Sequence, residues 1–381
     1  MIMNIKKLTA ILLSVIFVLS FASCGEKDMT SKENAEKNKT ITILALGDNL
    51  LHMPVIEDSK KEDGSYDFSH IYQNLQPQIK SADIAVIGQE TVFAGEEYEY
   101  SGYPLFNSPS DAGKTLVKEG FDVILHASNH VLDKWALGVE NTLKFWDEYP
   151  EITVLGINHT PAEQKVPKIA NIKGAKIALL NYTYGTNSLT LPAGKEYMVN
   201  YIDEEKIKKD AEFANKCADF TIAFMHWGVE NMTDVQPSQK DLAKKMCEMG
   251  VDLIIGSHPH VIGPVEWIES ENGNRMLVYY SLGNFVSRQL EEKNLLGGLA
   301  DVKLIYNGEK VTIDEFSFVP VVTYYDKDYK NFTVYKLKNM PNSAFSSHGL
   351  TNHGINVSKD GYKKIAEEVF DGYDKSMIDM E

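Results

Sequence analysis

Apolar and polar residues follow two different periods along this chain, and these periods predict the elements. Short runs that are almost wholly apolar indicate buried β-strands, whereas stretches with an apolar residue every three or four positions indicate amphipathic helices. Strands are expected at Ile41–Gly47, Asp83–Gly88, Asp122–Ala127, Thr153–Ile157, Lys176–Tyr184, Phe220–Met225, Asp252–Gly256 and Arg275–Leu282. Helices are expected between them, at about 110–119, 136–148, 203–217 and 237–249. Apolar strands separated by helices predict an α/β fold in which a sheet is covered on both faces.

The pattern changes near residue 297. Consecutive strands joined by turns are expected at Leu299–Tyr306, Lys310–Val319 and Val321–Lys336, followed by a last helix near Lys359–Phe370. No internal repeat and no Gly/Pro-rich linker interrupts the chain after residue 40. We therefore expect an α/β domain over residues 41–296, with residues 297–381 as a β-rich extension of the same domain. The extension either adds strands to the same sheet or forms a small appended subdomain.

The first residues predict export from a bacterial cell. Lys6 and Lys7 precede an apolar run, Leu8 to Phe21, that is short for a membrane span, and small residues follow it. We interpret residues 1–23 as a signal peptide; an uncleaved membrane anchor is the alternative. Cys24 stands where bacterial lipoproteins carry their lipid, and residues 24–40 are polar enough to form a flexible tether. The domain is thus expected at the extracellular face of the cytoplasmic membrane, anchored by lipid.

Charge narrows the range of partners. The chain carries a formal charge of −16, and without the two leader lysines the remainder carries −18. Such an acidic surface repels nucleic acid, so nucleic acid is excluded as a general partner, and it favours cations. Two cysteines remain after the leader, Cys217 and Cys247. They could form a disulfide outside the cell or be buried thiols, but two cysteines at this spacing do not make a metal site.

The candidate chemistry lies at the ends of five predicted strands. Each of these strands is followed by residues that can bind a metal ion: Asp48 and His52, Glu90, Asn129 and His130, His226, and His258 with His260. In an open α/β sheet the carboxyl ends of the strands meet at one edge, so we expect these side chains to lie together. Carboxylates, imidazoles and an amide oxygen without thiolates favour Mn, Zn or Fe. There are more of these groups than one tetrahedral ion needs, which favours two divalent ions that share a carboxylate.

Each of these residues also has a structural interpretation. An aspartate after a strand, such as Asp48, is often a turn or helix cap, and Asn129 could stabilise a left-handed turn. His226 could be a core histidine, and His126 lies inside its predicted strand, where a packing role is expected. The coincidence of five strand ends favours a metal site over these separate explanations.

Six segments carry most of these residues. They are Gly47-Asp48-Asn49-Leu50-Leu51-His52, Gln89-Glu90-Thr91, Ala127-Ser128-Asn129-His130-Val131-Leu132-Asp133, His226-Trp227-Gly228-Val229-Glu230, Gly256-Ser257-His258-Pro259-His260-Val261 and Ser281-Leu282-Gly283-Asn284-Phe285. Together they resemble the bacterial capsule synthesis protein CapA family, which is associated with poly-γ-glutamate production. The resemblance implies a calcineurin-like metallophosphoesterase-type αββα sandwich for residues 41–296. The first Asp and His, Asp48 and His52, are four residues apart here, whereas metallophosphoesterases place them two apart. This difference in spacing argues against His52 as a direct metal ligand.

The resemblance also implies roles. Asp48, Glu90 and His260, with His52 as a further candidate, would hold one ion. Glu90 would bridge to a second ion held by Asn129, His226 and His258. His130 would be the general acid, oriented by Asp133 or another carboxylate. Substrate contacts are assigned to Asn284 in the last segment, to Arg288 just after it, and to Tyr184 at a strand end; Arg288 could equally be a surface charge and Tyr184 a packing residue.

Three functions remain open. The first is a surface protein in synthesis, export or anchoring of poly-γ-glutamate or a related anionic polymer, working with membrane capsule-synthesis proteins. The second is a general extracellular metal-dependent phosphoesterase, and the third is a scaffold without catalysis. The sequence lacks a G-x-S-x-G nucleophile turn, a phosphate-binding P-loop and a dinucleotide-binding glycine turn. An ATP-consuming ligase step would therefore belong to a partner.

Overall fold

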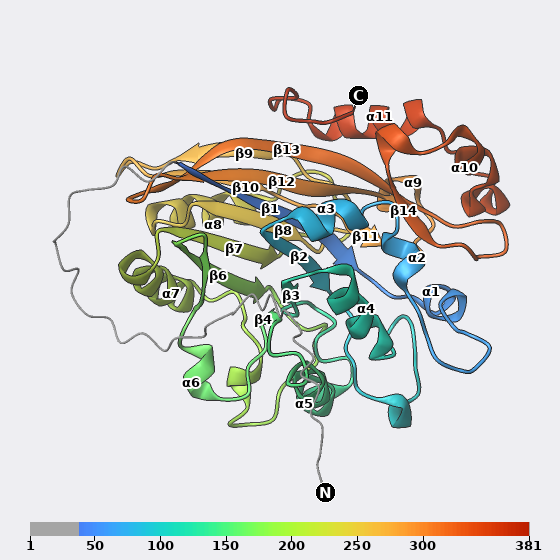
Figure 1. Cartoon of the computed structure of the whole chain (residues 1–381), viewed down its shortest axis with the longest axis horizontal. Coiled ribbons are helices and arrows are strands. Elements are labelled where there is room, and N and C mark those ends of the chain that lie inside the picture. Colours follow the sequence, from blue (N-terminus) through green and yellow to red (C-terminus); the bar gives the residue numbers. More distant parts are fainter. Residues whose placement is uncertain (1–37, 381) are drawn as a thin grey trace, which may run out of the picture. The chain divides into compact units, whose positions relative to one another are not determined.

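Two β-sheets pack face to face and helices cover their outer faces (Figure 1). The computed structural model of the protein describes residues 38–380. The expected αββα sandwich is therefore confirmed. The expectation drawn from the apolar runs alone, a single covered sheet, is wrong because strands β5 to β10 form a second sheet.

Sheet 1 has the strand order β14-β13-β12-β1-β2-β3-β4, and β11 pairs with the end of β1. Strands β1 to β4 are parallel, whereas β12, β13 and β14 are antiparallel to their neighbours. The strands are β1 Lys39–Asn49, β2 Ile84–Gln89, β3 Val123–Leu125, β4 Thr153–Leu155, β11 Asn284–Val286, β12 Leu296–Tyr306, β13 Val311–Tyr324 and β14 Thr333–Lys336. The chain after residue 296 thus adds strands to the first sheet, directly beside β1.

Sheet 2 has the order β5-β6-β7-β8-β10-β9, in which β6, β7, β8 and β10 are parallel. In β7, Ile222 and Phe224 belong to the core between the sheets, whereas Ala223 and Met225 pack on the other face. A parallel strand with both faces covered is apolar throughout, as its sequence predicted. The strands are β5 Lys168–Ile172, β6 Ala175–Thr183, β7 Phe220–His226, β8 Leu253–Ser257, β9 Val265–Glu269 and β10 Arg275–Tyr279.

Helices α7 and α8 cover the outer face of sheet 2, where α7 with Ile207 packs on β6 and β7, and α8 with Met246 packs on β9 and β10. Helices α2, α3 and α4 lie beside β2, β3 and β14, and α11 runs along β13, where Phe370 contacts Phe318 (Figure 1). The helices are α1 Met53–Asp58, α2 Ser69–Tyr72, α3 Gln76–Ser81, α4 Asp111–Glu119, α5 Trp135–Trp146, α6 Pro161–Gln164, α7 Glu204–Cys217, α8 Pro237–Glu248, α9 Glu292–Leu295, α10 Asn342–Ser347 and α11 Lys359–Val369. All five expected helices are present.

Several element boundaries differ from the expectation. β1 begins at Lys39, so the last residues of the proposed tether belong to the sheet. β13 continues through Pro320 where two strands were expected. Pro320 lies just before the residues that pair with β14, and Gly298 opposite donates its N–H to Leu282 O at 2.8 Å, so the missing N–H of proline leaves the ladder intact. Strands β5, β9 and β11 were not expected from the sequence.

The predicted signal peptide, the lipid-bearing Cys24 and most of the tether lie outside the described residues. Within residues 38–380 no helix is long and apolar enough to cross a bilayer. Cys247 is a buried thiol whose Sγ lies 3.5 Å from the carbonyl oxygens of Ile268 and Asn274, and it does not pair with Cys217.

Candidate metal centre

The predicted strand ends meet where the two sheets face each other. The polar residues that end or follow five strands lie here: those of β1, β2 and β3 in sheet 1, and those of β7 and β8 in sheet 2. Two groups of three residues bring potential ligand atoms within 4.8 Å of one another: Asp48 with Glu90 and His260, and Glu230 with His258 and His260. The convergence that the sequence indicated is therefore present, although it joins two sheets and not one sheet edge.

Asp48 is buried at the end of β1, where the strand bulges and pairs with β11 opposite Asn284. Gly47 permits this approach, because a Cβ at this position would lie 2.0 Å from Gly283 O. The Asp48 carboxylate accepts the backbone N–H of His258 at 3.0 Å, which ties sheet 1 to the turn after β8. Burial raises the pKa of Asp48 to about 7, against the opposing effect of hydrogen bonds from His258 and Ser257.

Glu90 is a buried carboxylate that the protein itself leaves without a hydrogen bond. It follows β2, it is buried, and neither of its carboxylate oxygens has a hydrogen-bond partner. Burial raises its pKa well above the ordinary range, and the charges of Asp48, Glu230 and Asp133 raise it further. A buried carboxylate without partners is unfavourable by several kcal/mol, and a bound cation removes this penalty. The donor set thus fits a metal ion.

His226 ends β7 between the two carboxylates, with its ring nitrogens 3.8 Å from Asp48 Oδ1 and Glu90 Oε1. Its Nε2 lies 2.8 Å from Asn129 Oδ1, and its Nδ1 lies 3.0 Å from Ser257 Oγ. Burial lowers the pKa of His226 well below the usual value, and neighbouring histidines lower it further. The imidazole is therefore neutral, which is the form that binds metal ions.

The turn His258-Pro259-His260 presents two imidazoles from strained backbone, since φ is +97° at His258 and +57° at His260. Asn284 Oδ1 accepts from His260 Nδ1 at 2.9 Å, which leaves Nε2 of that ring for a ligand. His258 Nδ1 is buried without a partner. Burial lowers the pKa of both histidines to about 3, so both are neutral at physiological pH.

His130 and Asp133 form a buried pair beside Asn129. His130 Nδ1 lies 2.7 Å from Asp133 Oδ2, and the same oxygen accepts the Phe106 N–H at 2.7 Å. The Phe106 ring meets His130 edge-on at 4.7 Å. Because the carboxylate holds a proton on Nδ1, the other ring nitrogen, Nε2, is the one that can exchange a proton with a substrate.

His52 lies outside the two groups of converging ligand atoms, although it is near enough to His260 for its charge to lower the pKa of that ring. It is the residue before α1, its Nδ1 accepts the Arg288 N–H at 3.2 Å, and its ring packs on Phe106 at 5.3 Å. Burial lowers its pKa to about 4. His52 belongs to neither group of converging ligand atoms, which agrees with the unusual spacing between Asp48 and His52.

The three residues assigned to the substrate have different positions. Tyr184 is half-exposed and lies over His258, with ring centroids 4.4 Å apart, where a substrate can reach it. Arg288 stacks on the Tyr329 ring at 4.4 Å, and its Nε is buried without a hydrogen bond. Asn284 differs from the expectation: it is fully buried, and its amide group binds His260, Gln289 and the carbonyl of Asn294. Its geometry is that of a residue that positions His260.

Sequence reasoning missed two groups of the site. Glu230 lies on the exposed loop after β7, and a carboxylate in such a loop resembles any surface charge. Asn181 lies inside β6, and its side chain accepts the Ala127 N–H at 3.0 Å and donates to Phe224 O at 3.1 Å. It thereby fixes the segment that carries Asn129. A polar residue in the middle of an apolar strand was the available signal for Asn181.

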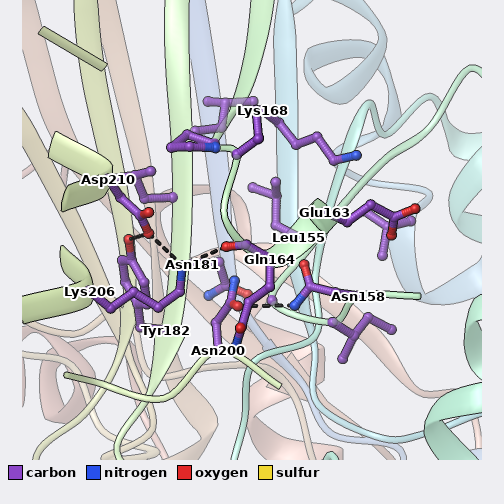
Figure 2. A pocket seen from close by; sticks show the side chains of 17 residues that line it. Leu155, Asn158, Glu163, Gln164, Lys168, Asn181, Tyr182, Asn200, Lys206 and Asp210 are labelled. Atoms are coloured by element: carbon purple, nitrogen blue, oxygen red, sulfur yellow. Dashed lines mark hydrogen bonds and ion pairs between the residues drawn. The ribbon is translucent and has the colours of Figure 1, made fainter. Parts of the chain in front are cut away.

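A cavity of about 30 Å³ lies behind this site, between β4, β6 and α7 (Figure 2). Lys206 reaches from α7 to the carbonyl of Gln164 at 2.6 Å and to Asp210 at 2.8 Å, and Tyr182 donates to Asp210 at 2.5 Å. Asn181 lines both this cavity and the metal-type site. The cavity has room for a few water molecules at most, and Figure 2 shows Lys206 bonded to Gln164 and Asp210, and Asn158 bonded to Asn200.

Comparison with known proteins finds a matching family and two similar capsule proteins. Residues 42–289 match the family described as bacterial capsule synthesis protein PGA_cap. The chain is 27% identical over 313 residues to the PGA biosynthesis protein CapA of Bacillus subtilis (strain 168), covering 78% of this chain and 77% of that protein. It is 26% identical over 335 residues to the capsule biosynthesis protein CapA of Bacillus anthracis, covering 84% and 79%.

Solved structures similar to this chain include a 5'-nucleotidase precursor from Thermus thermophilus, with a TM-score of 0.47 and 11% identity over 74% of this chain and 54% of that one. The calcineurin-like phosphoesterase YfkN from Bacillus subtilis has a TM-score of 0.43 and 12% identity over 88% of this chain and 98% of the other.

Proposed function

Because the chain belongs to the bacterial capsule synthesis protein PGA_cap family, we propose that it acts outside the cell in synthesis, export or anchoring of poly-γ-glutamate or a related anionic capsule polymer. We further propose that it does so as a metal-dependent hydrolase or transferase. The observation that carries this proposal is the buried Glu90 carboxylate, which has no protein partner and lies among neutral imidazoles. Such a group is stable beside a cation and unstable without one.

Two divalent ions, of Mn, Zn or Fe, fit the donor set. Asp48, Glu90 and His260 would hold one ion, and Glu90 would bridge to a second held by Asn129, His226 and His258. Bound ions of this kind supply an activated water at neutral pH and positive charge for the oxygens of an ester or amide under attack. The residues themselves supply the orientation: Asn284 holds His260, and Ser257 holds His226.

His130 is the proposed general acid. Its Nδ1 faces Asp133 at 2.7 Å, so the carboxylate fixes the orientation of the ring and leaves Nε2 toward the substrate. In the charged form Nε2 carries the proton that a leaving oxygen or nitrogen needs, and it takes up a proton again for the next cycle. The Phe106 ring packs on His130 and keeps water from one side of it.

The negative charge of the chain restricts the binding of an anionic polymer to one place on the surface. At a formal charge of −16 the surface repels an anionic polymer in general, so attraction is confined to the metal site. The proposed lipid on Cys24 would keep the domain at the outer face of the membrane, next to membrane proteins that make the polymer. A general extracellular phosphoesterase would use the same residues, and the substrate distinguishes the two.

Metal content and hydrolysis test the proposal together. The purified full chain is assayed with an aryl phosphomonoester, an aryl phosphodiester and poly-γ-glutamate, beside Glu90→Gln and the surface control Glu248→Gln. We expect bound ions and turnover in the wild type and the control, with both lost in Glu90→Gln. Turnover of the polymer favours the capsule role, and turnover of phosphoesters alone favours the phosphoesterase. A wild type that binds no ions would contradict both and leave a scaffold.

A further inference from the structure

We propose that Glu230 is an additional metal ligand, which supplies a carboxylate oxygen to the ion held by His258. This rests on the di-metal site proposed above and adds to it a residue from the loop between β7 and α8. Neither the strand-end pattern nor the ligand assignment by resemblance includes Glu230.

The loop of Glu230 is fastened to the ligand turn. Asn231, next to Glu230, has φ +64° and donates its backbone N–H to Pro259 O at 2.7 Å. Its side-chain oxygen accepts from Asn294 at 2.7 Å, and its carbonyl oxygen accepts from Lys293 at 3.1 Å. These bonds hold the loop against the turn His258-Pro259-His260. The position of Glu230 beside that turn is therefore set by its own backbone neighbour.

The Glu230 carboxylate points toward ligands and toward like charge. One of its oxygens lies within 4.8 Å of ring nitrogens of His258 and His260. Its negative charge contributes to the raised pKa of Glu90 and to that of Tyr184, which burial and these charges raise to about 12. No ion pair with a lysine or arginine compensates Glu230 within residues 38–380. The ammonium group of Lys293, which lies at Asn231 O, forms its ion pair with Glu291, so the Glu230 carboxylate remains available to a bound cation.

The imidazole available to Glu230 is that of His258. Asn284 occupies Nδ1 of His260, so His260 offers a single nitrogen, which lies 3.8 Å from Glu90 Oε1 on the side of the first ion. His258 has a buried Nδ1 without any partner. A buried imidazole nitrogen without a protein partner is a second sign, independent of the carboxylates, of a metal-binding position. Glu230 would thus supply an oxygen, and His258 a nitrogen, to the same ion.

The additional carboxylate has chemical consequences. With Asp48 and Glu90 it brings three negative charges to the site, so two divalent ions leave one positive charge in place of two. Oxygen donors also favour harder ions such as manganese over zinc. Since Glu230 is exposed, it is the ligand that an incoming anionic group meets first.

Calorimetric titration of the metal-free full chain with Mn²⁺ tests this assignment, with the Mn²⁺ electron paramagnetic resonance spectrum as a second readout. The variants are Glu230→Gln, Asp234→Asn as a charge-matched control from the same loop, and Glu90→Gln as the test of the site itself. We expect two ions in the wild type and the control. In Glu230→Gln one ion should bind about tenfold more weakly or worse, with an altered spectrum.

Wild-type affinity for both ions in Glu230→Gln, with loss in Glu90→Gln, would overturn the role of Glu230 and leave the proposed metal site standing. Equal weakening in Asp234→Asn would assign the effect to surface charge and would also overturn it. A wild type without bound ions would overturn the metal site and this proposal together.

Discussion

Replacing Asp48 by Asn is expected to make the metal-free protein more stable. The carboxyl group has an ordinary pKa of 3.8 and a pKa of about 7 in the folded chain, because burial opposes its ionisation. A raised folded pKa means that the folded state keeps a proton which the unfolded state releases. The stability of the wild type therefore falls as pH rises through the range from about 4 to 7, and the full penalty is present above pH 7.

The magnitude follows from the size of the shift. A difference of about three pH units at about 1.4 kcal/mol each corresponds to about 4 kcal/mol. Asparagine cannot ionise, and its side-chain oxygen can still accept the His258 N–H. In chelator at pH 8.5 the variant should therefore exceed the wild type by up to about 4 kcal/mol in free energy of unfolding. At pH 4 the difference should nearly vanish.

Denaturant unfolding followed by circular dichroism, in EDTA at pH 4, 6 and 8.5, measures this difference. Asp314→Asn, an exposed carboxyl group on β13, is the control and should have no such effect. Added Mn²⁺ at a hundredfold excess over its dissociation constant should stabilise the wild type by about 3 kcal/mol and the Asp48→Asn variant much less. A variant that is less stable than the wild type in EDTA at pH 8.5, or a gain that does not depend on pH, would refute the reasoning.

Three further outcomes are expected. His130→Gln and Asp133→Asn should each lower turnover by about 10²- to 10⁴-fold with metal content retained, because they remove proton transfer or its orientation; loss of ions in the elemental analysis would instead place them among the ligands. Asn284→Ala should weaken Mn²⁺ binding about ten- to a hundredfold in calorimetry, since His260 loses the group that orients it, and unchanged affinity would show that the ring is held by other contacts. EDTA should lower the midpoint of thermal unfolding more at pH 8 than at pH 5, because protonation of Asp48, whose pKa is about 7, competes with the ions; an equal effect at both pH values would contradict this.

The sequence predicts the strands of this fold better than their pairing. Runs such as Phe220–Met225 are apolar because both faces of the strand are covered, and this shows that a strand is buried but not which neighbour it has. The division into two sheets after β4 depends on packing between segments far apart in the chain. Likewise, Pro320 suggested a break in β13, since the sequence does not show that its nitrogen lies beyond the end of the β14 ladder.

The strand-end rule located the candidate ligands because it depends only on where a strand stops. Asp48, Glu90 and His226 were found in this way. Glu230 escaped it because the loop that carries it reaches the site through a backbone bond from Asn231, which no spacing reveals. Asn284 was found but given a substrate role, since the direction in which a side-chain amide points is decided by its buried neighbours.

The central place of β1 in sheet 1 determines when the site can exist. β1 carries Asp48, and its neighbours include β11 and β12, which come from the last third of the chain. A ribosome or a translocation channel releases the first strand long before these partners, and such distant pairings close slowly. Asp48 and the Asn284 that orients His260 therefore come into place only after the chain has been made through β11, and β1 gains its second neighbour only with β12. If the site holds ions as proposed, they would be taken up in the compartment in which folding ends. A chain that stops short of β12 would contain every candidate ligand but would leave the edge of β1 from Lys39 to Leu46 without its partner.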